Sequence, residues 1–263
     1  MYGLSLKTIA WIIVIFICAC SSLQIKQRQD VAAVCAETKP SFFEACGKGD
    51  VTNVMCLVEE KIVDVNERDK YQWTGLMYAI QNGHENLAEY FLIKKANINQ
   101  QDKDGLTPLM IAVNERHPNL VEFLLQAGAD PVMQDRHGYS ALMWSIYNKS
   151  WDSIPLLLAT GKGIDLQNGF GETALHLAAY YNQPDIVSML VKKKAPINIQ
   201  DQQGLTPLML AAQYGSENMV AFLVENQADL KLKNTVGENA LDLARKRNRQ
   251  KTVEYLETKI KKE

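Results

Sequence analysis

The sequence predicts an all-α solenoid, and two observations support this fold class. First, a six-residue motif of the type Thr-Pro-Leu-Met-Ile-Ala recurs every 33 residues without insertion, starting at positions 41, 74, 107, 140, 173, 206 and 239. Second, most copies follow a turn-forming run and precede a second apolar segment. Seven copies in phase indicate a repeat array, in which each unit packs only on its neighbours around one elongated core.

The first helix of each unit can be placed from the copy at residues 102–131. An Asp-Lys-Asp-Gly run opens it, and this is turn chemistry, because Asp bonds the nearby backbone and Gly tolerates positive φ. Thr107 is expected to cap the helix, with Pro108 as its first residue, where a missing N–H breaks no hydrogen bond. The buried stripe of this helix is then Leu109, Ala112 and Val113.

The second helix of the same unit is expected to begin at Asn119, after a bend at residues 116–118. Gly128 is expected to end this helix in the left-handed conformation. Its apolar face is larger than that of the first helix and comprises Leu120, Val121, Phe123, Leu124 and Leu125.

The period and the motif resemble those of ankyrin repeats, most closely at Thr173-Ala174-Leu175-His176. The resemblance implies seven units of a turn plus two helices over residues 40–263, with a hydrogen bond from His176 between neighbouring units. It also implies a concave surface, made of turn tips and first helices, that binds a protein partner.

The two ends of the array differ from the middle. The first unit carries Phe42 and Phe43 and lacks the turn, whereas the last is rich in basic residues: Arg245, Lys246, Arg247, Arg249 and Lys251. Terminal repeats need a polar outer face, so we interpret this basic unit as a cap. Contact of these residues with phospholipid headgroups is the alternative.

The first residues have the features of an export signal. Lys7 precedes an apolar run from Ile9 to Ala19, which is about half the length of a membrane span and matches the core of a signal peptide. The run Ile17-Cys18-Ala19-Cys20 resembles a bacterial lipobox, although Cys18 departs from the pattern. By this resemblance residues 1–19 are a lipoprotein signal peptide, Cys20 is lipidated, and Ser21 directs the protein to the outer membrane, facing the periplasm.

Residues 20–39 are polar and read as a tether between the lipid and the array. An uncleaved anchor is the alternative, and it would also place the array outside the cytoplasm. Cys35, Cys46 and Cys56 would then lie in an oxidising compartment, where a disulfide is plausible. Cys46 falls at a buried position and Cys56 at an exposed one, which favours a Cys35–Cys56 bond, but all three pairings remain open.

No catalytic or metal-binding pattern is present. The four histidines lack metal-ligand spacing, and neither a nucleophile elbow nor a phosphate-binding loop is found. A formal charge of −2 does not favour nucleic acid. We therefore expect no enzyme activity, metal, cofactor or small-molecule substrate.

Aromatic residues crowd the predicted concave surface. Six of the ten tyrosines fall there, and the predicted partner-binding residues are Tyr71, Trp73, Tyr139, Tyr147, Phe170, Tyr180, Tyr181 and Tyr214. Tyr and Trp dominate interface hot spots. The alternative is structural, namely stacking of each ring on the next turn.

The sequence therefore favours a protein-binding scaffold held in the bacterial envelope by lipid. This architecture and address resemble those of immunity proteins that neutralise phospholipase effectors delivered by type VI secretion. The alternative is a maintenance or stress protein that supports a periplasmic enzyme or complex. A secreted effector aimed at a host is a third reading, which the lipobox argues against.

Overall fold

The computed structural model describes residues 42–261. The predicted signal peptide (1–19), the tether (20–39) and the lipid-bearing Cys20 lie outside the described residues. The described part contains fourteen α-helices and no β-strand, apart from two isolated bridges inside loops. The predicted all-α solenoid is confirmed.

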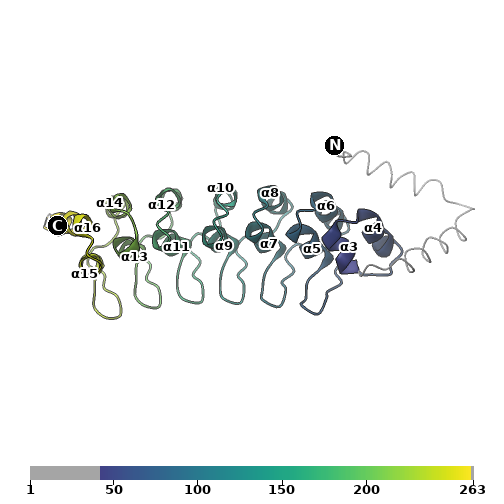
Figure 1. Ribbon diagram of the computed structural model, residues 1–263, viewed down its shortest axis with the longest axis horizontal. Coiled ribbons are helices and arrows are strands. Elements are labelled where there is room, and N and C mark those ends of the chain that lie inside the picture. The colour runs from purple at the N-terminus through teal and green to yellow at the C-terminus, as the bar shows by residue number, and fades with distance from the viewer. Residues whose placement is uncertain (1–41, 262–263) are drawn as a thin grey trace, which may run out of the picture.

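The helices form seven pairs that stack into one extended array (Figure 1). One row consists of the inner helices, which lie next to the long loops: α3 (Phe42–Lys48), α5 (Gly75–Gln81), α7 (Pro108–Asn114), α9 (Ala141–Tyr147), α11 (Ala174–Tyr180), α13 (Pro207–Tyr214) and α15 (Ala240–Lys246). The other row consists of the outer helices: α4 (Val51–Glu59), α6 (Glu85–Ile93), α8 (Pro118–Gln126), α10 (Ser153–Ala159), α12 (Pro184–Lys192), α14 (Glu217–Glu225) and α16 (Gln250–Ile260).

The inner helices begin where their capping residues dictate. Thr107 is the N-cap of α7, and its hydroxyl oxygen accepts the backbone N–H of Met110 at 3.3 Å. The same bond caps the other inner helices from α5 to α15, through Thr74, Ser140, Thr173, Thr206 and Asn239. Because a cap links residues only three apart, it can be predicted from local sequence.

The outer helix of the same unit starts one residue earlier than predicted. Helix α8 begins at Pro118 rather than Asn119, because a proline is well suited to the first helical position, where no N–H is needed. Its end is as predicted, since Gly128 lies two residues beyond Gln126 with a φ of +94°. Leu120, Val121 and Leu124 are buried, whereas Phe123 and Leu125 are half-buried.

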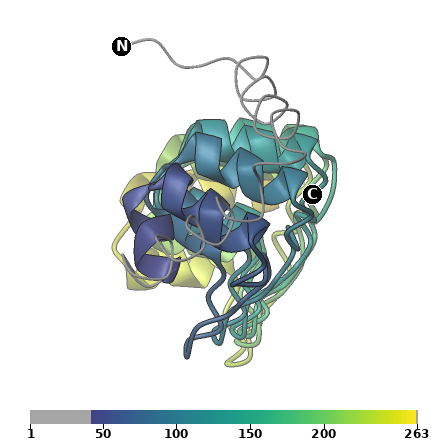
Figure 2. The ribbon, with the colours of Figure 1, turned by 90° about the vertical axis from the view of Figure 1, so that its right-hand side faces the viewer.

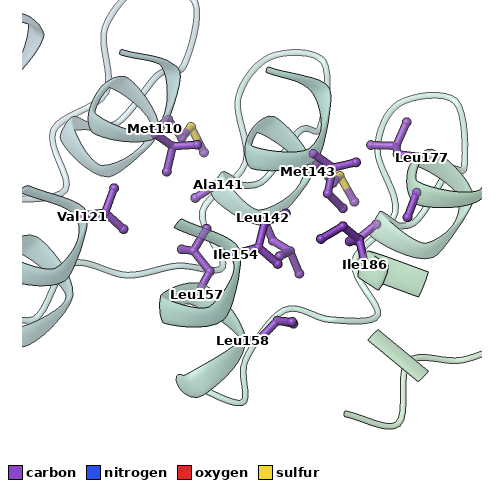
Figure 3. Packing of buried hydrophobic residues seen from close by; sticks show 14 of the residues in the cluster. Met110, Val121, Ala141, Leu142, Met143, Ile154, Leu157, Leu158, Leu177 and Ile186 are labelled. Atoms are coloured by element: carbon purple, nitrogen blue, oxygen red, sulfur yellow. The ribbon is translucent and has the colours of Figure 1, made fainter. Parts of the chain in front are cut away.

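The core is one continuous cluster that runs through every unit. In Figure 3, Met110 and Val121 of one unit lie near Ala141, Leu142 and Ile154 of the next. Small residues at the middle of the inner helices, such as Ala112, Ala178 and Ala211, have no exposed surface. These alanines allow neighbouring inner helices to pack closely, which keeps all units in the same orientation.

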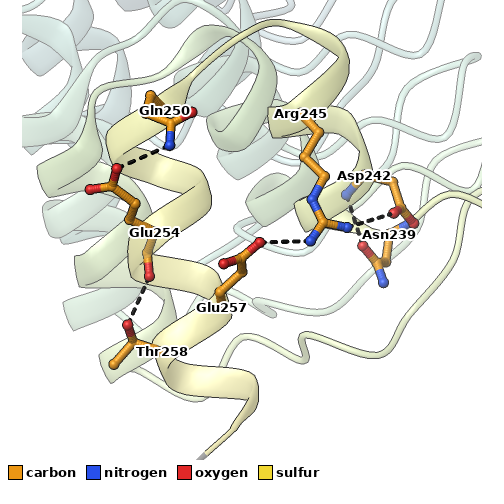
Figure 4. Close-up of polar contacts among 7 residues, drawn as sticks. All are labelled: Asn239, Asp242, Arg245, Gln250, Glu254, Glu257 and Thr258. Atoms are coloured by element: carbon orange, nitrogen blue, oxygen red, sulfur yellow. Dashed lines mark hydrogen bonds and ion pairs between the residues drawn. The ribbon is translucent and has the colours of Figure 1, made fainter.

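The long loops all project from the same side of the array, as the end-on view shows (Figure 2). At the C-terminal end the basic residues of the last unit are held by the chain itself. Arg245 bonds Glu257 at 2.7 Å (Figure 4), and Lys246 bonds Glu238 at 2.9 Å. These contacts agree with the interpretation of the last unit as a cap.

Candidate functional site

Each long loop is folded by one Asp or Asn side chain. In the loop before α13, Oδ1 of Asp201 accepts the backbone N–H groups of Gln203 and Leu205, each at 2.8 Å. Asp69, Asp102, Asp135, Asn168 and Asn234 make the same pair of bonds in the other loops. One oxygen is enough for this turn, so the second oxygen of each Asp is available for another contact.

Neighbouring loops are bonded to each other. The backbone N–H of Gln202 donates to the carbonyl oxygen of Phe170 at 3.0 Å, and that of Thr235 donates to Gln203 at 2.9 Å. The side chain of Gln200 donates to the carbonyl oxygens of Gly204 and Lys233, at 2.7 and 2.8 Å. These bonds fix the register of the loops, so that side chains from different units form one surface.

His176 joins two units from a fully buried position, as the resemblance implied. Its Nε2 lies 3.0 Å from the carbonyl oxygen of Leu205, and its Nδ1 lies 3.1 Å from the backbone nitrogen of Thr173. Burial, partly offset by the bond to Leu205, lowers the pKa of His176. A neutral imidazole with a proton on Nε2 satisfies both contacts, and this role is structural.

Six aromatic side chains form a continuous row along the inner helices and the loops beside them. The rings of Tyr147 and Tyr181 are 6.1 Å apart between centroids, and those of Tyr180 and Tyr214 are 4.9 Å apart. Both contacts cross from one unit to the next. We call this set the aromatic row: Tyr139, Trp144, Tyr147, Tyr180, Tyr181 and Tyr214.

The row is partly open to solvent. Tyr147, Tyr180 and Tyr214 expose 49%, 46% and 37% of their surface, whereas Tyr139 and Tyr181 are half-buried and packed against the core. Five of the eight predicted partner-binding residues are therefore brought together. Their arrangement has features of both interpretations of the sequence, partner binding and structural stacking. The half-buried rings support the exposed ones, which can contact a partner.

Two hollows lie between the aromatic row and the loops. One has a volume of about 420 Å³ and is bordered by Tyr180, Tyr214 and Glu238. The other has a volume of about 370 Å³ and is bordered by Tyr139, Tyr180 and the predicted residue Phe170. Two carboxylates, Glu172 and Asp201, line both hollows.

The remaining two predicted residues, Tyr71 and Trp73, lie apart from this row. Tyr71 is exposed at the tip of the first long loop, with the Lys70 ammonium group 4.9 Å from its ring centroid. Trp73 is half-buried, and its indole N–H donates to Oδ2 of Asp102 at 2.9 Å. Trp73 therefore joins its loop to the next one, and its polar atom has a structural partner.

Sequence reasoning placed Glu172 at a turn tip of the concave surface without selecting it as a partner-binding residue, and it did not find two further residues of this surface, Trp144 and Asp201. The indole of Trp144 donates to Oδ2 of Asp135 at 3.0 Å, and its ring packs on Tyr139 and Tyr147. A comparison of residue types at equal positions in successive units could have singled out these three residues.

Burial raises the pKa of two phenols of the row, those of Tyr139 and Tyr181. Burial, followed by the negative charge of Glu172, raises the pKa of Tyr139. Burial also raises the pKa of Tyr181, with contributions from Tyr147 and Tyr180. Glu172 and Asp201 are the ionisable side chains other than tyrosine that line both hollows, and both are acidic.

The cysteines in the described region have different states. Cys46 is free and completely buried, and burial raises its pKa to about 12. Cys56 is disulfide-bonded. Because Cys46 is free, its two possible pairings are wrong. The favoured partner, Cys35, lies outside the described residues, so that pairing remains a prediction.

Between residues 42 and 261, no group of three or more His, Cys, Asp or Glu side chains is arranged to hold a metal ion. Over the same range, no helix is both long and apolar enough to cross a bilayer.

Stacked helix pairs with an exposed, grooved inner face are typical of repeat scaffolds that bind partners on a concave surface. A family model described as "Ankyrin repeats (3 copies)" matches residues 17–102, 42–135, 87–168, 142–234 and 175–262. The chain belongs to the ankyrin repeat family, whose members bind protein partners.

Solved structures show the same fold. A chain of the complex between the predatory endopeptidase Bd0816 from Bdellovibrio bacteriovorus and the immunity protein Bd3460 is 30% identical, with a TM-score of 0.63. The match covers 73% of this chain and 100% of that one. The ankyrin repeat domain of human ASB11 is 28% identical with a TM-score of 0.66, covering 78% of this chain and 92% of that domain.

The ankyrin repeat domain of Bcl-3 has a TM-score of 0.73 and covers 84% of this chain and 99% of its own length. Its sequence identity is 22%, so this likeness concerns the fold alone.

Proposed function

We propose that this protein is an immunity protein that binds an enzyme in the bacterial envelope and blocks its activity. The observation that carries the proposal is the 30% identity, over the full length of the matched chain, with the complex of an endopeptidase and its immunity protein. The lipobox-like residues ending at Cys20 support the proposal independently, because they suggest that this chain is located in the envelope.

The inner surface has the properties that such a partner needs. Tyr147, Tyr180 and Tyr214 are exposed and held by ring contacts and by bonded loops. A surface that is already rigid loses little conformational entropy when it binds, so more of the contact energy appears as affinity. Exposed tyrosines supported in this way are the residue type that forms interface hot spots.

We further propose that the enzyme is a hydrolase that acts on a component of the envelope. The resemblance to periplasmic ankyrin lipoproteins favours a phospholipase effector delivered by type VI secretion. The solved complex contains an endopeptidase, and this supports a hydrolase more broadly. In either case the immunity protein would cover the active site or the substrate-binding face of the enzyme.

The lipid on Cys20 and the polar residues 20–39 would hold the array on the periplasmic face of the outer membrane. A tethered inhibitor is concentrated where the incoming enzyme arrives.

The direct experiment is capture of envelope proteins by the wild-type chain and by a triple variant, Tyr147→Ala, Tyr180→Ala and Tyr214→Ala. We expect the wild type to retain a hydrolase whose activity falls on binding, and the variant to lose it with an unchanged circular dichroism spectrum. Met189→Ala is the control, because Met189 is 40% exposed on outer helix α12, away from the row.

The genetic experiment is a competition between a deletion strain and sibling cells that deliver the effector. We expect the deletion strain to be killed and the wild-type gene to restore survival. Equal survival would refute the immunity role, and a constitutively expressed, non-toxic partner would indicate the maintenance function instead.

A further inference from the structure

We infer that the protein partner places a cationic side chain, Arg or Lys, beside residues that line both hollows. The cation would lie between the ring of Tyr180 and the carboxylates of Glu172 and Asp201. This inference deepens the proposed function, but it depends only on the chain having a protein partner. It follows from a comparison of residues at equal positions in different units.

The first comparison is with the contact between Trp73 and Asp102. There, a donor on one loop meets an acceptor on the next, at 2.9 Å. Three units later the same two positions are occupied by Glu172 and Asp201. Two acceptors therefore occupy the positions at which Trp73 and Asp102 pair a donor with an acceptor.

The second comparison is between the Asp residues that fold the loops. Oδ2 of Asp69 accepts the hydroxyl of Tyr78 at 2.8 Å, and Oδ2 of Asp135 accepts the indole N–H of Trp144 at 3.0 Å. At the corresponding position beside Asp201 stands Leu210, which has no donor. No side chain or backbone group between residues 42 and 261 donates to Oδ2 of Asp201.

Glu172 is also only partly satisfied. Its Oε2 accepts the side-chain N–H of Asn168 at 2.8 Å, and no donor from the described part of the chain reaches Oε1. Among the residues that the structure describes, no Lys, Arg or His lines either hollow. Both carboxylates are half-buried, which reduces the screening of their charge by water and strengthens their attraction for a cation.

The rings beside the carboxylates suit the same ligand. Tyr180 borders both hollows, and the face of a tyrosine ring attracts a guanidinium or ammonium group. The chain already contains one such contact at the end of the row. The guanidinium of Arg247 lies 5.1 Å from the ring centroid of Tyr214 and donates to its hydroxyl at 3.1 Å.

The charge can be removed without disturbing the turn. Asp201→Asn keeps the oxygen that folds the loop, because Asn168 and Asn234 accept the same two backbone N–H groups in the neighbouring units. Glu172→Gln keeps the size of the other side chain. Glu225→Gln is the matched control, because Glu225 is exposed at the end of outer helix α14.

The test is a titration of the full chain with N-acetyl-arginine methylamide, followed by two-dimensional NMR. Its neutral isostere, N-acetyl-citrulline methylamide, is titrated in parallel. We expect saturable shifts centred on Glu172, Asp201 and Tyr180 for the arginine probe alone. The double variant, which carries Glu172→Gln and Asp201→Asn, should bind the arginine probe about tenfold or more weakly than the wild type. Glu225→Gln should bind the probe as the wild type does. An equal response to citrulline, an unchanged affinity in the double variant, or no saturable shift would overturn the inference.

The two proposals fail separately. If the arginine probe binds and no envelope hydrolase is captured, the proposed function is wrong and the cation site stands. If a hydrolase is captured with equal affinity by the wild type and by the double variant, the cation site is wrong and the immunity role stands.

Discussion

The ring of Tyr180 meets the ring of Tyr214 edge-on, with 4.9 Å between centroids, although the two residues belong to different repeats. Each tyrosine is the last residue of its inner helix. The contact therefore links the ends of α11 and α13 at the border of the hollow of about 420 Å³. It turns two exposed side chains into one rigid element of the surface.

Replacing Tyr180 with Ala should weaken partner binding by about 2 kcal/mol, because an exposed, supported tyrosine is typical of a hot spot. The free energy of unfolding should change little, since the ring is 46% exposed. Calorimetric titration and denaturant unfolding measure the two effects. Tyr181→Ala should reduce both the partner affinity and the free energy of unfolding, because Tyr181 is packed against the core. Loss of stability without loss of affinity in Tyr180→Ala would mean that the ring is structural.

Replacing Trp73 with Phe should lower the free energy of unfolding by about 1.5 kcal/mol, because the hydrogen bond to the Asp102 carboxylate is lost. The phenyl ring can still pack on Tyr78, which lies 5.1 Å from the indole. Urea unfolding measures the change. Trp151→Phe is the control, since Trp151 is 38% exposed. Equal stabilities of the two variants would contradict the role given to Trp73.

Acidification should destabilise the array through His176. Burial lowers its pKa in the folded state below the ordinary value of 6.5, so the unfolded chain takes up a proton more readily. The contribution of neutral His176 is complete above about pH 6.5 and is lost as the pH falls towards the lower folded pKa.

His176→Met isolates this effect, because Met110, Met143 and Met209 occupy the same position in other units. The variant should be less stable than the wild type near neutral pH but should lose less stability between about pH 7.5 and about pH 5. Urea unfolding at several pH values gives the comparison. Parallel curves for the two proteins would show that His176 does not control the pH dependence.

Cys46 should resist alkylation in the folded protein, because it is buried and its pKa is raised to about 12. Iodoacetamide labelling without reductant, followed by peptide mass mapping, should leave Cys46 unmodified until denaturant is added. Cys56 should remain unmodified even then and should react only after reduction, because it is disulfide-bonded. Labelling of Cys46 under native conditions would contradict its placement in the core.

Cys20→Ser should abolish lipid attachment and release the protein from the outer membrane, since the thiol is the proposed acylation site. Palmitate labelling and membrane fractionation measure the two outcomes, with Cys18→Ser as the control for the neighbouring cysteine. Membrane association that survives in Cys20→Ser would favour the uncleaved anchor.

The helices and their order could be predicted because the interactions that define them are local. Thr107 caps a helix through a residue three positions away, and Gly128 ends one by its own backbone freedom. The same reasoning missed the start of α8 by one residue, since a bend and a first helical turn both accept Pro118.

The site was predicted less completely, because its contacts join residues from different units. Sequence placed Trp73 with Tyr147 and Tyr180 on one surface, yet only the latter two belong to the aromatic row. Whether a ring is exposed or bonded depends on the residue that the next unit presents to it, such as Asp102 for Trp73.

The sequence by itself determined the solenoid, because a fixed period of capped helices and small core residues leaves one way of stacking. Only the tertiary structure decided which tyrosines touch, and that Glu172 and Asp201 share two hollows in which no donor from residues 42–261 reaches Oε1 of Glu172 or Oδ2 of Asp201. The reason is geometric. The sequence period shows that the units repeat, but the relative position of neighbouring units in space decides which of their side chains come into contact.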